Sequence, residues 1–194
     1  MRSNKFLTAS LLILLAGVSV AQVGSRVELK YRNSFSDIKI AKDNINSLRT
    51  DLNQASAADL AKSREETARL INSDLPLQFQ AVEFALSKEF GATEISLSSL
   101  KPEQLQELRS TINATSPEAG VELDSSVTGE EFSLYITLSM KDISAKGSQL
   151  LELVNGGSAS EIQIAKSELS LALARFDILT AYLVIGVESS SPDL

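Results

Sequence analysis

The stretch Asn155–Phe176, "NGGSASEIQIAKSELSLALARF", decides the fold predicted for this chain. Two glycines end one segment, and Ser158 followed by Glu161 is a capping box, the pattern that opens an α-helix. Apolar residues then recur at alternating spacings of three and four, which is typical of one helix face and of a coiled-coil seam. We therefore predict a long final helix that reaches almost to Glu188. Its apolar stripe consists of Ile162, Ala165, Leu169, Ala172, Phe176, Leu179 and Leu183.

The segment before the two glycines has the same design. Thr128 and Glu131 form a second capping box, and an apolar stripe continues from Phe132 to Val154. Two helices of this length joined by a Gly-Gly turn must lie antiparallel. We therefore predict a hairpin roughly 40 Å long.

The start of the final helix repeats an earlier part of the chain. "SFSDIKIAKDNI" at 34–45 and "SASEIQIAKSEL" at 158–169 share six identical positions out of twelve. The first copy predicts a helix capped by Ser36 or Asp37. Either an ancestral helical hairpin was duplicated, or similar rules for opening a helix produced both copies. The apolar stripe of the first copy is Ile38, Ala41, Ile45, Leu48 and Leu52.

The middle of the chain is less regular. A helix opens at Ser56 with a relative of the capping box. Because a residue before proline avoids the α region, we expect Leu75 to leave it and Pro76 to interrupt the helix. The segment is then two helices or one kinked helix, ending at Gly91. Its apolar stripe is Leu60, Thr67, Ile71, Phe79, Val82, Leu86 and Phe90.

Two short alternating stretches predict the only strands. These are "EISLS", with Ile95 and Leu97, and "VELDSSV", with Val121 and Leu123. Between them Pro102 opens a short helix, because proline is favoured in a first turn. The apolar face of this helix consists of Leu105, Leu108 and Ile112.

The N-terminus predicts export. Basic residues at 2 and 5, an apolar run over 7–18 and the small residues Ser19-Val20-Ala21 are typical of a secretory signal peptide covering 1–21. The chain has no cysteine, which excludes a lipid anchor and disulfides. We expect a single helical domain over 22–188, a disordered tail over 189–194, and a location in the periplasm or outer envelope of a bacterium.

The charge of the exported chain limits its partners. Without Arg2 and Lys5, 16 basic residues face 25 acidic ones, a net charge of −9. Nucleic acid needs a basic surface, so we expect no nucleic-acid partner. No segment after the signal is apolar for long enough to predict a transmembrane helix, and association with the outer membrane stays open.

Missing residue types also limit the chemistry. The chain has neither histidine nor cysteine, which removes the usual general base, the usual metal ligands and thiol catalysis. The pairs Glu65-Glu66 and Glu130-Glu131 are typical of a solvated face or a cap. Ser36 and Lys39 match S-x-x-K, but a helix cap explains Ser36 better. We expect no enzyme, and no catalytic, cofactor or metal site.

The final helix resembles a known family. The run Asn155–Gly186, with Ser158 and Glu161, is similar to the last coiled-coil helix of TolC-type outer-membrane efflux proteins. Asn155 stands where that family has glycine. The family is internally duplicated, but this chain is much shorter and lacks its long barrel strands. The resemblance implies a reduced relative that keeps the periplasmic coil. The remaining positions in register are Ile162, Ala165, Leu169, Ala172 and Phe176.

Two functions follow as hypotheses. The first is an exported structural or assembly component of the cell envelope, forming a homo-oligomer or binding an envelope partner through its helix-packing seams. The second is a monomeric bundle that binds a small apolar or cationic ligand between its helices. Ordinary core packing explains the seam residues at least as well as an interface does. The predicted fold is mainly α, an elongated bundle of antiparallel coiled-coil hairpins with at most two short strands. The seam residues are Ile38, Ile45, Leu48, Leu52, Ile162, Leu169, Phe176 and Leu183.

Overall fold

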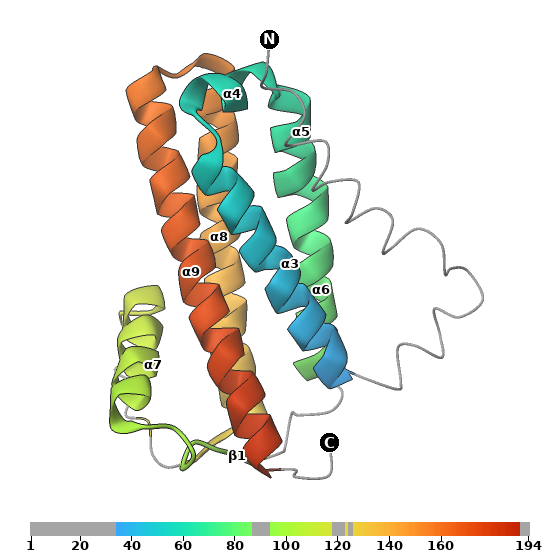
Figure 1. Ribbon diagram of the computed structural model, residues 1–194, viewed down its shortest axis with the longest axis vertical. Helices are drawn as coiled ribbons and strands as arrows, with labels where there is room; N and C mark the ends of the chain where they lie inside the picture. The colour runs from blue at the N-terminus through green and yellow to red at the C-terminus, as the bar shows by residue number, and fades with distance from the viewer. Residues whose placement is uncertain (1–33, 87–93, 118–122, 124–125, 191–194) are drawn as a thin grey trace, which may run out of the picture.

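The computed structural model describes residues 34–86, 94–117, 123 and 126–190. Long helices pack side by side in this part of the chain, together with one small two-stranded sheet (Figure 1). The predicted fold class, a mainly helical bundle, is confirmed. The predicted signal peptide, Phe90, Gly91, Val121 and the last four residues lie outside the described residues.

The predicted hairpin forms the most regular half of the bundle. It consists of α8 (Gly129–Gly156) and α9 (Ala159–Ser190). Both capping boxes are present: the backbone N–H of Glu131 donates to Thr128 Oγ1 over 3.2 Å, and that of Glu161 donates to Ser158 Oγ over 3.3 Å. α9 ends at Ser190, past the predicted end at residue 188, so residues 189 and 190 are helical and not part of a disordered tail as predicted. The side-chain hydroxyl of Ser189 donates to the carbonyl of Ile185.

The first described helix, α3 (Ser34–Gln54), begins earlier than predicted. Ser36 and Asp37 therefore lie in its first turn and are not the cap, which corrects the prediction. Several residues near this end have side chains that suit a cap, so the sequence pattern alone does not fix where the helix begins. After α3, Ser56 caps α4 (Ala57–Lys62) with a complete capping box to Asp59.

The return limb of the first half is broken into pieces. It runs through α5 (Arg64–Arg69), a π-helical turn η1 (Leu70–Asp74) and α6 (Leu75–Ala85). The expectation for Leu75 is wrong, since its φ of −62° and ψ of −49° are helical. Its N–H donates to the carbonyl of Leu70, five residues back. In a regular α-helix the Pro76 ring would clash with the carbonyl four residues before it. The wide π-helical turn shifts the preceding carbonyls relative to this ring, so the backbone stays in a helical conformation through Pro76.

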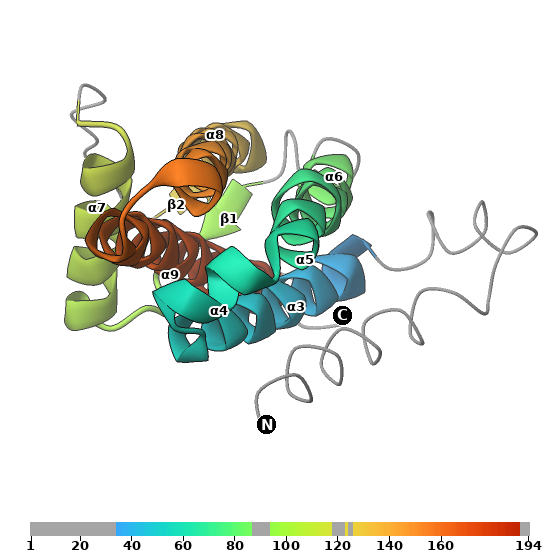
Figure 2. The ribbon, with the colours of Figure 1, turned by 90° about the horizontal axis from the view of Figure 1, so that it is seen from above.

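Four helical columns make up the bundle. Viewed from above, α3 and α9 form one layer, and α8 and the α5–α6 limb form the other (Figure 2). α3 runs antiparallel to both α6 and α9, and α8 is antiparallel to α9 (Figure 1). A further helix, α7 (Pro102–Thr115), lies outside the bundle against α9 and buries Leu108 and Ile112 as predicted.

The sheet closes one end of the bundle. β1 (Glu94–Ser96) confirms the first predicted strand and pairs antiparallel with β2 (Ser126–Thr128), with Ile95 opposite Val127. β1 packs against α9 at Gly186, where an added Cβ would lie 2.5 Å from Cγ2 of Ile95. A residue without a side chain is therefore needed for this contact.

Candidate functional site

The eight seam residues lie inside one chain. Each is at most 4% exposed, and all belong to a single hydrophobic core that also contains the apolar residues of α6 and α8. Phe176 of α9 lies beside Phe79 of α6, with ring centroids 5.5 Å apart. The seams of α3 and α9 are thus packed within the bundle. The seam residues of α3 are Ile38, Ile45, Leu48 and Leu52, and the seam residues of α9 are Ile162, Leu169, Phe176 and Leu183.

The repeated sequence places two equivalent lysines at the α3–α9 interface. Lys42 Nζ lies 3.3 Å from Asp177 Oδ1. Lys166 Nζ donates to the backbone carbonyls of Asn53 and Ala55, over 3.3 and 2.9 Å. Lys166 follows Lys42 by 124 residues, and Asp177 follows Asn53 by the same 124. The repeats therefore lie at opposite ends of an antiparallel helix pair. Lys42 contacts Asp177, and Lys166 contacts Asn53, which is the residue of α3 equivalent to Asp177 in the repeat.

The contact of Lys166 completes the end of α3. The last carbonyls of a helix have no partner within the helix, and a cationic side chain stabilises that end. Lys166 is only 7% exposed, so its ammonium is taken out of water and needs these acceptors. The lysine that the repeat supplies to α9 is therefore a structural residue at this interface.

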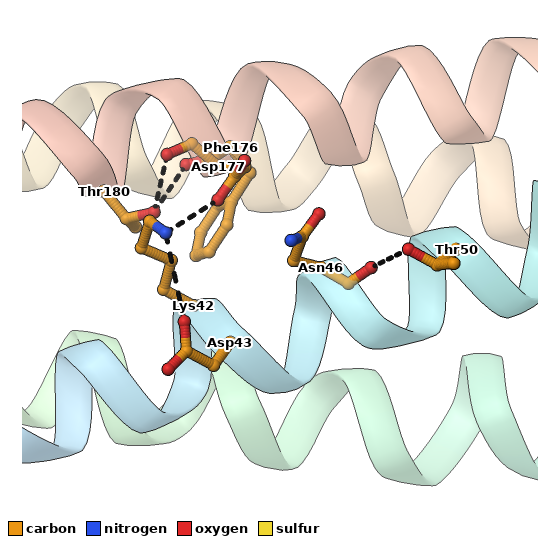
Figure 3. Close-up of polar contacts among 7 residues, drawn as sticks. All are labelled: Lys42, Asp43, Asn46, Thr50, Phe176, Asp177 and Thr180. Atoms are coloured by element: carbon orange, nitrogen blue, oxygen red, sulfur yellow. Dashed lines mark hydrogen bonds and ion pairs between the residues drawn. The ribbon is translucent and has the colours of Figure 1, made fainter. Parts of the chain in front are cut away.

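The contact of Lys42 is a half-buried ion pair (Figure 3). Lys42 also faces Asp43, with 3.9 Å between Nζ and Oδ1. The Oδ1 atoms of Asn46 and Asp177 are buried and receive no hydrogen bond from the described residues. The hydroxyl of Thr180 is occupied by carbonyls of its own helix. This cluster joins two helices, and its described residues place no nucleophile beside a base.

A second polar joint holds α7 on the bundle. The hydroxyl of Tyr182 on α9 donates to a carboxylate oxygen of Glu107 on α7. Burial, together with this hydrogen bond, raises the pKa of Tyr182 to about 12. The guanidinium of Arg109 donates to the carbonyl of Leu123, and so ties α7 to the segment that leads toward β2.

A small hollow lies near the C-terminal end of α3. Residues of α3, α4, α5 and η1 line a hollow with a volume of about 30 Å³. Most of the lining is apolar, and the two carboxylates belong to Asp51 and Glu66. Sequence reasoning treated Glu66 together with Glu65 as a solvated face and missed this hollow. The usable signal was position, because Glu66 precedes the buried Thr67 of the apolar stripe. The other lining residues are Leu48, Leu52, Ala55, Leu60 and Leu70.

Two large apolar side chains are exposed on the outer face of α9, among polar residues. Ile164 and Leu171 are 58% and 53% exposed, although they alternate with the buried positions Ala165 and Leu169. Within the described ranges, α9 from Ala159 to Ser189 is the one helix long and apolar enough to cross a membrane. Half of its most apolar window is buried in the bundle, and a core helix meets the same criterion.

Within the described ranges, acidic side chains form no group of three or more that could hold a metal ion.

No family model matches the chain, and comparisons with curated proteins and with solved structures gave no significant match. The resemblance to TolC-type proteins accordingly stays a prediction.

Proposed function

We propose that this chain is an exported helical-bundle protein of the bacterial cell envelope with a structural or assembly role, in which one chain forms a complete bundle. The observation that carries the proposal is the burial of all eight seam residues within one core. A coiled coil that assembled through these stripes would leave them exposed in the single chain. Association with a second copy or an envelope protein then uses the outer faces of the bundle.

Export is the part of this proposal that rests on the sequence alone. The basic start, the apolar run and the small residues before position 22 support it. Kinship with efflux proteins is the finer part, supported by the pattern of α9 after Ser158. The absence of histidine and cysteine supports a role outside catalysis.

The solution mass of the exported chain tests the proposal. Light scattering coupled to size exclusion should give the mass of one chain, and cell fractionation should find it outside the cytoplasm. A ring of three or more chains would contradict the self-contained bundle and favour an efflux-type assembly. A chain that keeps residues 1–21 and stays in the cytoplasm would contradict export.

A second candidate function is the binding of a small ligand. The hollow among α3, α4 and α5 favours it, because it combines an apolar lining with carboxylates from two helices. The size and charge of the hollow limit the class of ligand that it can hold.

A further inference from the structure

The hollow between α3 and the return limb distinguishes two neighbouring glutamates. Glu66 lines it and is partly buried, whereas Glu65 is exposed and is not part of the lining. The hydroxyl of Thr67, also in the lining, donates to the carbonyl of Ser63 over 3.0 Å. The hydroxyl proton of Thr67 is thus used within its own helix, and leucines make up half of the lining residues.

The size of the hollow limits what it can hold. An apolar cavity that binds benzene has a volume of roughly 150 Å³, and pockets for drug-sized ligands are larger still. A volume of about 30 Å³ therefore excludes a ring, and it suits the end of an unbranched alkyl chain. Leu48, Leu52 and Leu60 are each at most 4% exposed, so their packing keeps the hollow narrow.

The charge of the hollow selects the head group. Asp51 comes from α3 and Glu66 from α5, so two helices bring carboxylates to one small lining. Asp51 already takes part in another interaction, so the inference is based on Glu66 alone. Partly buried carboxylates attract a cation more strongly than fully solvated ones, because the surrounding dielectric constant is lower. An anionic head group would be repelled here.

The geometry points to a primary ammonium on an unbranched alkyl chain as the ligand of this hollow, with the chain among the leucines and the ammonium beside Glu66. The ligand is a free aliphatic amine. This inference rests on the second candidate function and specifies its ligand. It is independent of whether the bundle also has a structural role.

Titration of the purified exported chain with n-alkylamines from methyl to hexyl tests the ligand class. Affinity should rise roughly fourfold for each of the first one or two added methylenes and then level off, because a volume of about 30 Å³ holds only one or two carbon atoms. The methyl NMR signals of Leu48, Leu52, Leu60 and Leu70 should shift together. Alcohols and carboxylates of equal length should bind more weakly, and added salt should weaken the amines.

Two matched variants test the position of the charge. Glu66→Gln should weaken amine binding about threefold to tenfold while leaving binding of the equal-length alcohol unchanged. Glu65→Gln removes the same charge from the neighbouring exposed position and should change amine affinity less than twofold. Neither glutamate is fully buried, so both proteins should melt like the parent.

Several outcomes would overturn the inference. These are an alcohol that binds as tightly as the amine, equal losses in the two glutamine variants, or leucine methyl signals that do not move. A lysine-containing peptide that binds more tightly than the free amine would overturn the assignment to a small ligand. A monomeric, exported bundle that binds no amine would also overturn the inference, and it would leave the proposed structural role intact.

Discussion

The two halves of the bundle differ in how continuous their helices are. α8 and α9 are continuous helices joined by a turn at Gly157, whereas α3 is followed by the short helix α4 and by a return limb that is divided into α5, η1 and α6. Both halves bury one apolar stripe in the same core. The difference shows that an apolar stripe fixes which face is buried, while local features such as caps and the π-helical turn decide whether one regular helix carries it.

The two halves also meet unevenly. α3 and α9 are joined by side chains that span their interface, including the two lysines of the repeat. α8 and η1 instead come close enough that a Cβ added at Gly147 would lie 2.8 Å from Cγ2 of Ile71.

The largest effect is expected from Leu169→Asp in the buried stripe of α9. A carboxylate without a partner would replace a side chain that is 1% exposed, at a cost of about 3–5 kcal/mol in the free energy of unfolding. Urea unfolding measures it. Leu171→Asp is the matched control, two residues along the same helix and 53% exposed, and should change stability by less than about 0.5 kcal/mol. Equal stability of the two variants would contradict the assignment of faces.

Gly147→Ala should destabilise the contact between the halves. The new methyl group overlaps the β-branched Ile71, which costs about 1–3 kcal/mol, and the better helix propensity of alanine offsets up to about 1 kcal/mol. Gly156→Ala, in the same helix with no atom within 4 Å of the added Cβ, should be neutral or slightly stabilising. Thermal unfolding compares the two, and a Gly147→Ala protein more stable than the parent would refute the close approach.

Thr128→Ala should destabilise the continuous half by about 1 kcal/mol, because the hydroxyl that accepts from the N–H of Glu131 is lost. Thr128→Ser keeps the hydroxyl and serves as the control. The two variants are compared by chemical unfolding. A serine variant as unstable as the alanine variant would show that packing, and not the cap, is responsible.

The smallest effect is a decline in stability as the pH falls below about 4.5. Hydrogen bonds from Ser56 and Ser158 lower the pKa values of Asp59 and Glu161, and those from Thr128 lower the pKa of Glu131. A lowered pKa in the folded state gives stability that is present above the unfolded values of 3.8 and 4.5, and that is lost as pH falls through the folded ones.

One carboxyl in the broken limb acts in the opposite direction. Burial raises the pKa of Asp74, so its protonation at low pH favours the folded state and partly offsets the loss. Asp74→Asn removes that offset and should make the acid decline steeper. Unfolding curves between pH 7 and pH 3 measure both proteins. Stability that stays constant over this range would contradict the role of the capping carboxylates.

The same contrast separates what could be predicted from what could not. The hairpin was predictable because Thr128, Ser158 and the glycines mark the helix ends, and because the stripe has a regular spacing. The helical conformation of Leu75 was not, since a local rule for residues before proline does not include the wide turn that the return limb adopts. The hollow was also missed, because Asp51 and Glu66 are brought together only by the packing of α5 on α3.

The sequence by itself determined the helical class, the hairpin, the capping boxes and the buried stripes, because each depends on residues a few positions apart. Only the tertiary structure decided that the stripes of α3 and α9 close on one core within a single chain. It likewise decided that Lys42 and Lys166 reach equivalent positions across the same interface. These features depend on contacts between residues more than a hundred positions apart, which local periodicity does not encode.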